Sequence, residues 1–366
     1  MLLLLAVLFL CGFGLLILYS ASSYNGEVRF GDSAWYLKKQ FFAMALGLAA
    51  MTAVSSIDYH ALKRLAGPAY LLSLVLSGAV LLFGDAYNGS RRWLSIGPLS
   101  FQPAEYAKPA VILLLASVAG GKTRSPDAGA HDGRIFGNTR SRSLTVSVFL
   151  AVLPIVALVG KNNLSTAVII LGIAMIMIFV SNPKYLPFLW MILAGVGFLA
   201  VFLSLESYRL ERLAVWRHPE LYEKGYQTLQ GLYAIGSGGL FGLGLGNGIQ
   251  KLGFVPEAQN DMIFSVICEE LGLFGAAILI LLFLLLLWRF MVIATHAPDL
   301  FGSLIAAGIM GHIAIQVILN IAVVTNTIPN TGITLPFVSY GGTSMLFLLS
   351  EMGLALSVSR GSTIRP

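Results

Sequence analysis

Long apolar runs separated by short polar connections make up most of the chain. A helix needs about 20 apolar residues to cross a bilayer, and runs of roughly that length recur along the whole sequence. They lie at 1–20, 37–55, 66–84, 105–119, 143–160, 163–181, 185–204, 262–288, 301–323 and 337–358. Because so little chain remains between most of them, the pattern predicts an all-α polytopic membrane protein of about ten transmembrane helices, with residues 1–366 forming a single domain.

The first apolar run has some features of a signal peptide, because Ala21, Ser22 and Ser23 form a small-residue patch after it. The run begins at Met1, however, with no basic segment before it. We therefore expect a first transmembrane helix whose cytoplasmic lead is very short or has been trimmed.

Two connections are long. Residues 120–142 are rich in Gly, Ser, Asp and Arg and are predicted to form a disordered basic loop in the cytoplasm. Residues 205–261 mix aromatic and charged side chains with glycines between Gly236 and Gly248, so we expect a large, ordered and partly re-entrant extracytoplasmic loop. No Gly-Lys-Ser or Gly-Lys-Thr follows these glycines, which favours close backbone packing over a nucleotide loop. With the basic loop 120–142 in the cytoplasm, both termini are expected to face the cytoplasm as well.

Composition excludes a soluble globular protein. Of 366 residues, 57% are hydrophobic and 11% are charged, and the mean hydropathy is +0.82. The net charge of +6 comes from 23 Lys and Arg residues spread between apolar runs, which fits contact with lipid phosphates better than nucleic-acid binding. Cys11 and Cys268 lie in or beside apolar stretches, so neither a disulfide framework nor a cysteine metal site is indicated.

Charged side chains beside the spans are the first candidates for function, because charge is costly at membrane depth. Arg91 and Arg92 precede a helix that is predicted to begin at Pro103, with Glu105 in its first turn and Lys108 on the same side. One interpretation is a helix start with a self-paired Glu105 and Lys108. The other is that the basic side chains bind a phosphate-bearing lipid headgroup.

A second acidic cluster precedes the span at 262–288. Asp261 stands directly before the apolar run, where it is suited to cap a helix. Together with Glu269 and Glu270 it places three carboxylates within a few turns of the membrane boundary, which is more than a cap requires. A carboxylate there is a candidate general base, since desolvation raises its proton affinity and cationic neighbours lower it.

Two further polar segments interrupt the apolar pattern. Residues 161–166 join two spans, and Asn163 at such a short turn is typical of a helix cap. Residues 331–344 bring prolines and glycines to a point where a helix should begin, which predicts broken backbone that lines a cavity or is buried in protein. A close-packed interface of small residues is the alternative.

In this order and at these separations, the polar segments resemble those of SEDS proteins, the FtsW, RodA and SpoVE group of cell-wall glycosyltransferases. The set covers nearly the whole chain, and its order is more specific than any one segment. The matching segments are Tyr19 to Ser23, Arg92-Trp93, Gln102 to Lys108, Ala234 to Asn247, Pro256 to Asp261, Glu269 to Gly272 and Leu335 to Gly342.

The details of the resemblance point to one branch and include two departures. Residues 244–252 are more similar to the division and sporulation branch than to the elongation branch. Gln259-Asn260 stand where the family usually has His-Thr, which leaves the following aspartate in place. Residues 162–166 lack the carboxylate of the family's usual turn, so no catalytic role is assigned to Asn163.

The resemblance implies a function and a set of site residues. It implies polymerisation of lipid II into β-1,4 glycan strands at the outer face of the bacterial cytoplasmic membrane, with Asp261 as the base of a single inverting step. A divalent cation, Mg²⁺ or Mn²⁺, is the expected cofactor. The expected partners are lipid II, a monofunctional class B penicillin-binding protein and other division or elongation proteins. The residues expected to bind substrate are Arg92, Gln102, Glu105, Lys108, Arg212, Glu257 and Ser339.

Two other functions remain compatible with the same residues. A lipid II flippase also needs broken helices and charged cavity residues, although it should need charge along the entire crossing, whereas an outward-facing Asp261 favours chemistry. A non-catalytic scaffold of the division complex is the second alternative. It would make Asp261→Ala silent for glycan synthesis.

Overall fold

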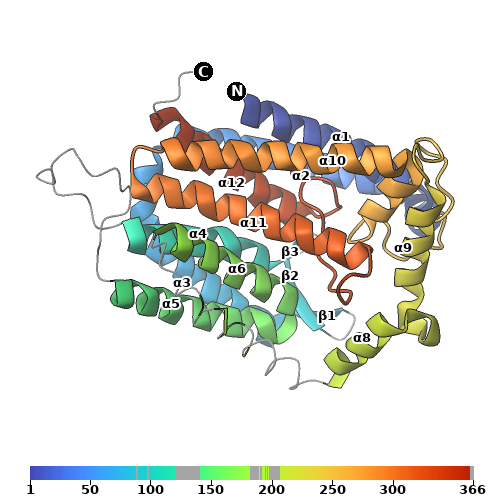
Figure 1. The fold of residues 1–366 in the computed structure, drawn as a ribbon, viewed down its shortest axis with the longest axis horizontal. Helices are drawn as coiled ribbons and strands as arrows, with labels where there is room; N and C mark the ends of the chain where they lie inside the picture. Colours follow the sequence, from blue (N-terminus) through green and yellow to red (C-terminus); the bar gives the residue numbers. More distant parts are fainter. Residues whose placement is uncertain are drawn as a thin grey trace, which may run out of the picture. The chain divides into compact units, whose positions relative to one another are not determined.

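The computed structural model describes residues 1–87, 90–96, 99–120, 141–181 and 207–362, with a few single positions between 189 and 197. Its chain forms two compact units, each assembled from segments far apart in the sequence. The first unit contains residues 1–51, 200–289 and 313–352, and the second contains residues 52–199, 290–312 and 353–366. Figure 1 shows that helices account for most of the described chain.

Within the first unit, side-chain hydrogen bonds join the N-terminal helices to the C-terminal half of the chain. Ser20 on α1 donates to Glu270 on α10 at 2.7 Å, and Gln40 on α2 donates to the backbone carbonyl of Ser339 at 3.3 Å. The helices of this unit, four of which continue into the second, are α1 (Leu2–Phe30), α2 (Trp35–Ser56), α8 (Ser207–Arg217), η1 (Pro219–Leu221), η2 (Glu223–Gly225), α9 (Tyr226–Ser237), α10 (Ile263–His296), α11 (Leu300–Val324) and α12 (Gly342–Gly361).

The described part of the second unit contains four complete helices and a small sheet. α3 packs against α4 and α5, and α6 packs against the same two helices, as the neighbouring ribbons in Figure 1 show. The antiparallel sheet, in the order β1-β2-β3, connects α3 to α4. The elements are α3 (Tyr59–Phe83), β1 (Asp85–Tyr87), β2 (Ser90–Ile96), β3 (Leu99–Phe101), α4 (Pro103–Gly120), α5 (Ser141–Asn162) and α6 (Leu164–Ser181).

The polytopic helical architecture is confirmed. Seven described helices are long and apolar enough to cross a membrane, and α4 and α5 coincide with two further predicted spans. The predicted span 185–204 and most of the predicted basic loop 120–142 lie outside the described residues. α1 continues past its apolar run to Phe30, because the chain ends the helix only at Gly31, a left-handed residue whose N–H group bonds the carbonyl of Glu27.

The helical fold also contains a small three-stranded sheet between α3 and α4, which the sequence analysis did not predict. β1 pairs with β2 over Asp85 to Tyr87, and β2 pairs with β3 over Leu99 to Phe101. The prediction missed these strands because each is short and the polar block was interpreted through its arginines. Asn88-Gly89 and Gly97-Pro98, which separate the strands in the sequence, were the local signals for turns.

The glycine-rich stretch after α9 packs backbone against backbone, as predicted. α10 is interrupted at Gly272, whose backbone (φ 65, ψ −167) is not helical. Around this break, the N–H group of Leu243 donates to the carbonyl of Glu269 at 2.9 Å, and that of Leu273 donates to Gly239 at 3.0 Å. The stretch therefore satisfies backbone groups of α10 that lie next to the break.

Gly238→Ala is expected to destabilise the protein severely. A Cβ at Gly238 would lie 1.9 Å from the carbonyl oxygen of Cys268 on α10, and relieving such a backbone clash costs at least about 1–3 kcal/mol of unfolding free energy. Gly236, in the last turn of α9 and two residues before Gly238, has no neighbouring atom within 4 Å of the place that a Cβ would take, and it provides the matched control. Thermal inactivation in detergent micelles is the measurement. Equal midpoints for Gly238→Ala and Gly236→Ala would contradict the packing described here.

Candidate active site

Asp261 lies two residues before α10, at a point where three segments of the first unit meet. Its side chain is nearly buried, with the residue 9% exposed. Its Oδ1 accepts a hydrogen bond of 3.3 Å from Gln227 Nε2 on α9, and its backbone carbonyl accepts one of 2.8 Å from Asn320 on α11. The carboxylate of Asp261 therefore contacts a side chain on α9, which lies well before it in the sequence.

The surroundings of Asp261 adjust its proton affinity. Burial is the largest cause that raises the pKa of the Asp261 carboxyl from 3.8 to about 6, and the charge of Glu257 acts in the same direction. The backbone N–H group of Asp261, the amide of Gln227 and the cation of Arg212 lower it. Such a carboxyl is ionised at neutral pH yet accepts a proton more readily than an exposed aspartate, which suits a general base.

The last turns of α1 hold the segment that leads to Asp261. Arg29 Nη1 lies 3.6 Å from Glu257 Oε1, and Asn25 Nδ2 donates to Gln259 Oε1 at 3.1 Å. Glu257 has a φ of 52°, which is rare for a residue with a side chain, and its Oε2 accepts a bond of 2.6 Å from Asn260 Nδ2. Glu257 thus organises the turn by bonds within the protein, while a contact with substrate stays a prediction.

Residues 325–341 contain the broken backbone that the prolines and glycines predict, and no part of this segment is helical. Ser339 Oγ donates to the carbonyl of Asn260 at 2.6 Å and accepts from the N–H group of Leu335 at 2.8 Å. Phe337, 2% exposed, has a φ of 64°, which is uncommon for a bulky residue. The segment therefore braces the turn before Asp261, and a contact of Ser339 with substrate stays a prediction.

The other two carboxylates of the acidic cluster are buried and have structural partners. Glu269 Oε1 accepts hydrogen bonds from the N–H groups of Ile249 at 2.8 Å and Gln250 at 3.0 Å. Glu270 is fully buried and pairs with Lys251 and Ser20. Both side chains thus fix the loop that follows α9, which leaves Asp261 as the carboxylate of this cluster available for chemistry.

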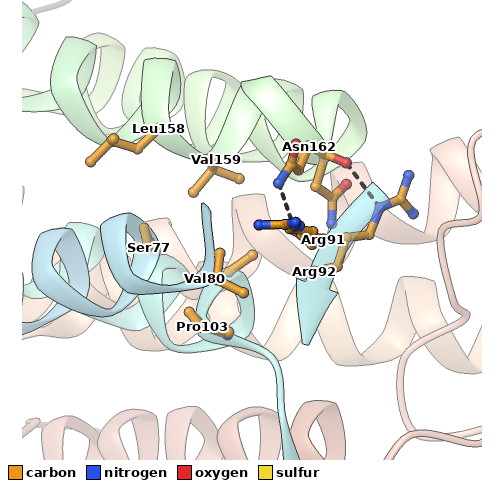
Figure 2. A pocket seen from close by; sticks show the side chains of 10 residues that line it. Ser77, Val80, Arg91, Arg92, Pro103, Leu158, Val159 and Asn162 are labelled. Atoms are coloured by element: carbon orange, nitrogen blue, oxygen red, sulfur yellow. Dashed lines mark hydrogen bonds between the residues drawn. The ribbon is translucent and has the colours of Figure 1, made fainter. Parts of the chain in front are cut away.

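In the second unit, Arg91 and Arg92 line a small pocket between α3, α4 and α5. Arg92 Nε donates to the carbonyl of Asn162 at 2.9 Å, and Asn162 Nδ2 donates to the carbonyl of Arg91 at 2.7 Å; Figure 2 shows both bonds. Val80, Pro103 and Leu158 are among the other lining residues. The structure thus joins β2 to the end of α5 and brings two basic side chains to one pocket.

The predicted self-pairing on α4 is confirmed. Lys108 Nζ donates to Glu105 Oε2 at 3.0 Å, and both residues are buried. The backbone carbonyl of Gln102, just before the helix, accepts from the N–H group of Glu105 at 3.0 Å. The cap predicted at Asn163 is also confirmed, since its Oδ1 accepts from the N–H group of Thr166 at 3.2 Å. Substrate binding by Gln102, Glu105 and Lys108 stays a prediction.

The predicted site residues therefore fall into two sets, each described within its own unit. Asp261, Glu257, Arg212 and Ser339 belong to the first unit. Arg212 Nη1 donates to the carbonyl of Asn330 at 3.1 Å. The second set belongs to the second unit and consists of Arg92, Gln102, Glu105 and Lys108.

Sequence reasoning missed two polar residues of the first set. Gln227 contacts the Asp261 carboxylate directly, and Asn330 Nδ2 donates to Gln227 Oε1 at 3.3 Å. Neither residue stands in a motif that indicates chemistry, and Gln227 lies on α9, 34 residues before Asp261 in the sequence. The only sequence signal was the position of Asn330 in the segment of broken backbone.

The described part of the chain offers no ready-made metal centre. Within it, no three His, Cys, Asp or Glu side chains group closely enough to hold a metal ion. Mg²⁺ is commonly held by one or two carboxylates together with substrate phosphates and water. A divalent cation at this site stays a prediction.

The sequence is similar to those of known proteins along almost its whole length. The model of the FtsW, RodA and SpoVE family, described as "Cell cycle protein", matches residues 1–364. "Stage V sporulation protein E" of Bacillus subtilis (strain 168) is 38% identical over 367 residues, covering 99% of this chain and 97% of that protein. "Probable peptidoglycan glycosyltransferase FtsW" of the same organism is 37% identical over 372 residues, covering 97% of this chain and 89% of that protein.

Two solved structures are similar in fold. A chain from "Structural coordination of polymerization and crosslinking by a peptidoglycan synthase complex" has a TM-score of 0.78 and 29% identity, with 98% of this chain and 96% of that chain covered. The Thermus thermophilus rod shape determining protein RodA has a TM-score of 0.71 and 29% identity, with 99% and 97% covered.

Fold and site define a polytopic helical membrane protein with a nearly buried, base-like carboxylate just before one of its helices. The whole-chain match shows which proteins of that class are its relatives. The chain belongs to the FtsW, RodA and SpoVE family.

Proposed function

We propose that this protein is a peptidoglycan glycosyltransferase that polymerises lipid II into β-1,4-linked glycan strands and releases undecaprenyl pyrophosphate, in cell division or sporulation. The observation that carries the proposal is similarity along almost the whole chain to relatives named FtsW and stage V sporulation protein E. The protein is a multi-pass protein of the bacterial cytoplasmic membrane, with its active site at the outer face.

Asp261 is the general base of the proposed reaction. Its carboxylate takes the proton of the acceptor sugar's 4-hydroxyl as that oxygen attacks the anomeric carbon of the donor. The new C–O bond forms as the bond to pyrophosphate breaks, and undecaprenyl pyrophosphate leaves. One base without a covalent enzyme intermediate converts the α-linked donor into a β-linked product, as inverting glycosidases do.

The remaining site residues act on the leaving pyrophosphate. Arg92, Arg212 and Lys108 supply cationic groups that stabilise its developing negative charge, which is a large effect in a site of low dielectric. Glu105 and Glu257 orient basic side chains of the site; the Glu105–Lys108 ion pair and the contact of Glu257 with Arg29 support this role. Gln102 and Ser339 bind the polar headgroup, and a bound Mg²⁺ or Mn²⁺ would supply further positive charge against the pyrophosphate.

A class B penicillin-binding protein is the proposed partner, together with other division proteins. The support is the structural similarity to a chain of a "peptidoglycan synthase complex" that combines polymerisation and crosslinking. In such a pair, the membrane protein makes the strand and the transpeptidase crosslinks it.

Sealed vesicles that contain fluorescent lipid II in one leaflet separate a polymerase from a flippase. The purified protein is added with and without the transpeptidase and Mg²⁺, and both glycan strands and the leaflet position of lipid II are measured. A polymerase accumulates strands and leaves unreacted lipid II in its leaflet. Movement of lipid II between leaflets without strands would overturn the proposal in favour of a flippase, and neither activity would favour a scaffold.

The rate of strand formation is expected to fall in mild acid. Asp261 must be ionised to act as a base, and its carboxyl has a pKa of about 6, so the active form is lost as pH falls through that value. The rate at pH 5 should be about tenfold below the rate at pH 8, with one decade lost for each further pH unit. Initial rates between pH 5 and 9 test this, and a rate that is constant down to pH 4.5 would contradict it.

A further inference from the structure

Asp261 is the end point of a chain of side-chain amides in the first unit. Gln227 Nε2 donates to Asp261 Oδ1 at 3.3 Å and lies 3.4 Å from the carbonyl oxygen of Pro256. Gln227 Oε1 accepts from Asn330 Nδ2 at 3.3 Å, and Asn330 Oδ1 accepts from the N–H group of Gly332 at 3.1 Å. Two amides thus connect the broken segment 325–341 to the candidate base.

The direction of every bond in this chain is fixed. An amide side chain offers donors on its nitrogen and acceptors on its oxygen, and its orientation is decided by its partners. The N–H group of Gly332 can only donate, so Asn330 must present its oxygen there and its NH₂ group to Gln227. The carbonyl of Pro256 can only accept, so Gln227 must present its NH₂ group to Pro256 and Asp261. Both ends therefore require the same orientation.

The segment that carries Asn330 is itself held against the base. Arg212 on α8 donates to the backbone carbonyl of Asn330 at 3.1 Å. Gly332 has a φ of 70°, and a Cβ at this position would lie 3.8 Å from Asp261 Oδ2. Asn330 is therefore supported on its backbone as well as through its side chain, so that it can fix the orientation of Gln227.

We propose that Gln227 and Asn330 form a directional hydrogen-bond relay that positions the Asp261 carboxylate for proton abstraction. This inference rests on the proposed glycosyltransferase function. Both residues are positioning residues, because they act through Asp261. Asn330 holds the Gln227 amide in one orientation, and Gln227 then presents a donor to one carboxylate oxygen and leaves the other for the acceptor hydroxyl. The donor also favours the ionised form of a buried carboxyl.

The relay predicts that Asn330 affects the base, although no described hydrogen bond joins Asn330 to Asp261. Without the Asn330 NH₂ group, the Gln227 amide is held in this orientation by its contacts with the carbonyl of Pro256, at 3.4 Å, and with Asp261, and it loses the partner of its oxygen. A rotated amide would set its oxygen against the carboxylate, and two facing acceptors destabilise the ionised base. Loss of Asn330 should therefore shift the acid limb in the same direction as loss of Gln227.

Two single variants and their combination test the relay by pH–rate profiles of strand formation from purified lipid II by the full-length protein. Gln227→Met keeps the length of the side chain and removes the amide, while Asn330→Leu keeps the size of the side chain and removes its donor. Gln227→Met is expected to lower the rate at pH 7 by about tenfold, since its lost bond is one to a charged group, and Asn330→Leu is expected to lower it by less. Each should move the acid limb to higher pH. The double variant is expected to match Gln227→Met, because Asn330 acts only through Gln227.

Gln230→Met is the matched control. Gln230 lies three residues after Gln227, on the same side of α9, and has no side-chain hydrogen bond in the described structure. Its rate and profile should equal those of wild type. If Gln227→Met does not fold by size-exclusion chromatography, Gln227→Ala makes the same comparison.

Three results would overturn the relay while wild type makes strands normally. The first is an acid limb that neither single variant moves, and the second is a double variant whose rate loss is the product of the two single losses. The third is an unchanged Asn330→Leu beside a shifted Gln227→Met, since Gln227 would then act alone. If wild type itself makes no strands under any condition, the proposed function fails and the relay fails with it.

Discussion

Asp261→Asn is expected to lower the rate of glycan-strand formation by about 10² to 10⁴, which is the usual contribution of a general base. Asn has nearly the same size as Asp, and its side-chain oxygen can still accept the bond from Gln227. What the substitution removes is the ability to take a proton from the acceptor hydroxyl. The measurement is the initial rate of strand formation at pH 8 with purified lipid II.

The same substitution should not unfold the protein. The folded state raises the pKa of this carboxyl from 3.8 to about 6, so the ionised form opposes folding and stability is lost as pH rises from about 4 to 6. A difference of about two in pKa corresponds to about 3 kcal/mol. The variant lacks this cost and should be at least as stable as wild type at pH 8, which a thermal inactivation curve measures.

Asp32→Asn is the matched control for chemistry. Asp32 is an aspartate of the same unit whose carboxylate accepts a hydrogen bond from the exposed Lys38 at 2.7 Å. The substitution should leave the rate of strand formation within about twofold of wild type, because an exposed ion pair contributes little. An Asp261→Asn variant with wild-type rates would show that the base lies elsewhere.

Lys251→Met is expected to cause the largest loss of stability among single substitutions of charged residues in the first unit. Lys251 and Glu270 form an ion pair in which the side chains are 4% and 0% exposed, and Ser20 on α1 hydrogen-bonds both partners. Removing one partner leaves the other buried without its counter-charge, which costs about 3–5 kcal/mol of unfolding free energy. The measurement is the temperature of half-inactivation in detergent micelles.

The double variant Lys251→Met/Glu270→Leu separates loss of the ion pair from loss of one partner. Replacing both charges with apolar groups is often nearly neutral, so the double variant should be more stable than either single variant. Lys38→Met breaks an exposed ion pair, with side chains 69% and 35% exposed, and should change stability by less than about 1 kcal/mol. Equal effects of Lys251→Met and Lys38→Met would contradict the buried arrangement.

The membrane-spanning part of the fold could be predicted because it depends on local properties of the sequence. Apolar runs identify α1, α6 and α10 directly, since a helix is the only open-ended structure that satisfies its own backbone in lipid. The sheet between α3 and α4 escaped prediction because strands of three to seven residues leave little periodicity. The break of α10 at Gly272 also escaped, since only contact with the glycine-rich stretch makes it stable.

The candidate site could be predicted as far as single residues reveal their chemistry. A carboxylate beside an apolar run marks Asp261, and proline at the helix start with Glu105 and Lys108 one turn apart marks their pairing. The role of Gln227 could not be predicted, because it depends on α9 bringing Gln227 Nε2 to 3.3 Å from Asp261 Oδ1. Only tertiary contacts show that Glu269 and Glu270 stabilise the fold. In the sequence, both stand close to the membrane boundary, where a catalytic carboxylate would also be expected.

The most direct test of the proposed mechanism is the anomeric configuration of the bonds that wild-type protein makes from purified lipid II. A single displacement with Asp261 as base requires every new bond to be β, inverted from the α-linked donor, with no glycosyl group attached to the protein at any time. Nuclear magnetic resonance of the strands gives the configuration of the new bonds. Mass spectrometry of the protein during turnover detects any glycosyl group attached to it. Beta bonds on an unmodified protein are the expected result, and retained α configuration or a glycosyl adduct on Asp261 would contradict the mechanism.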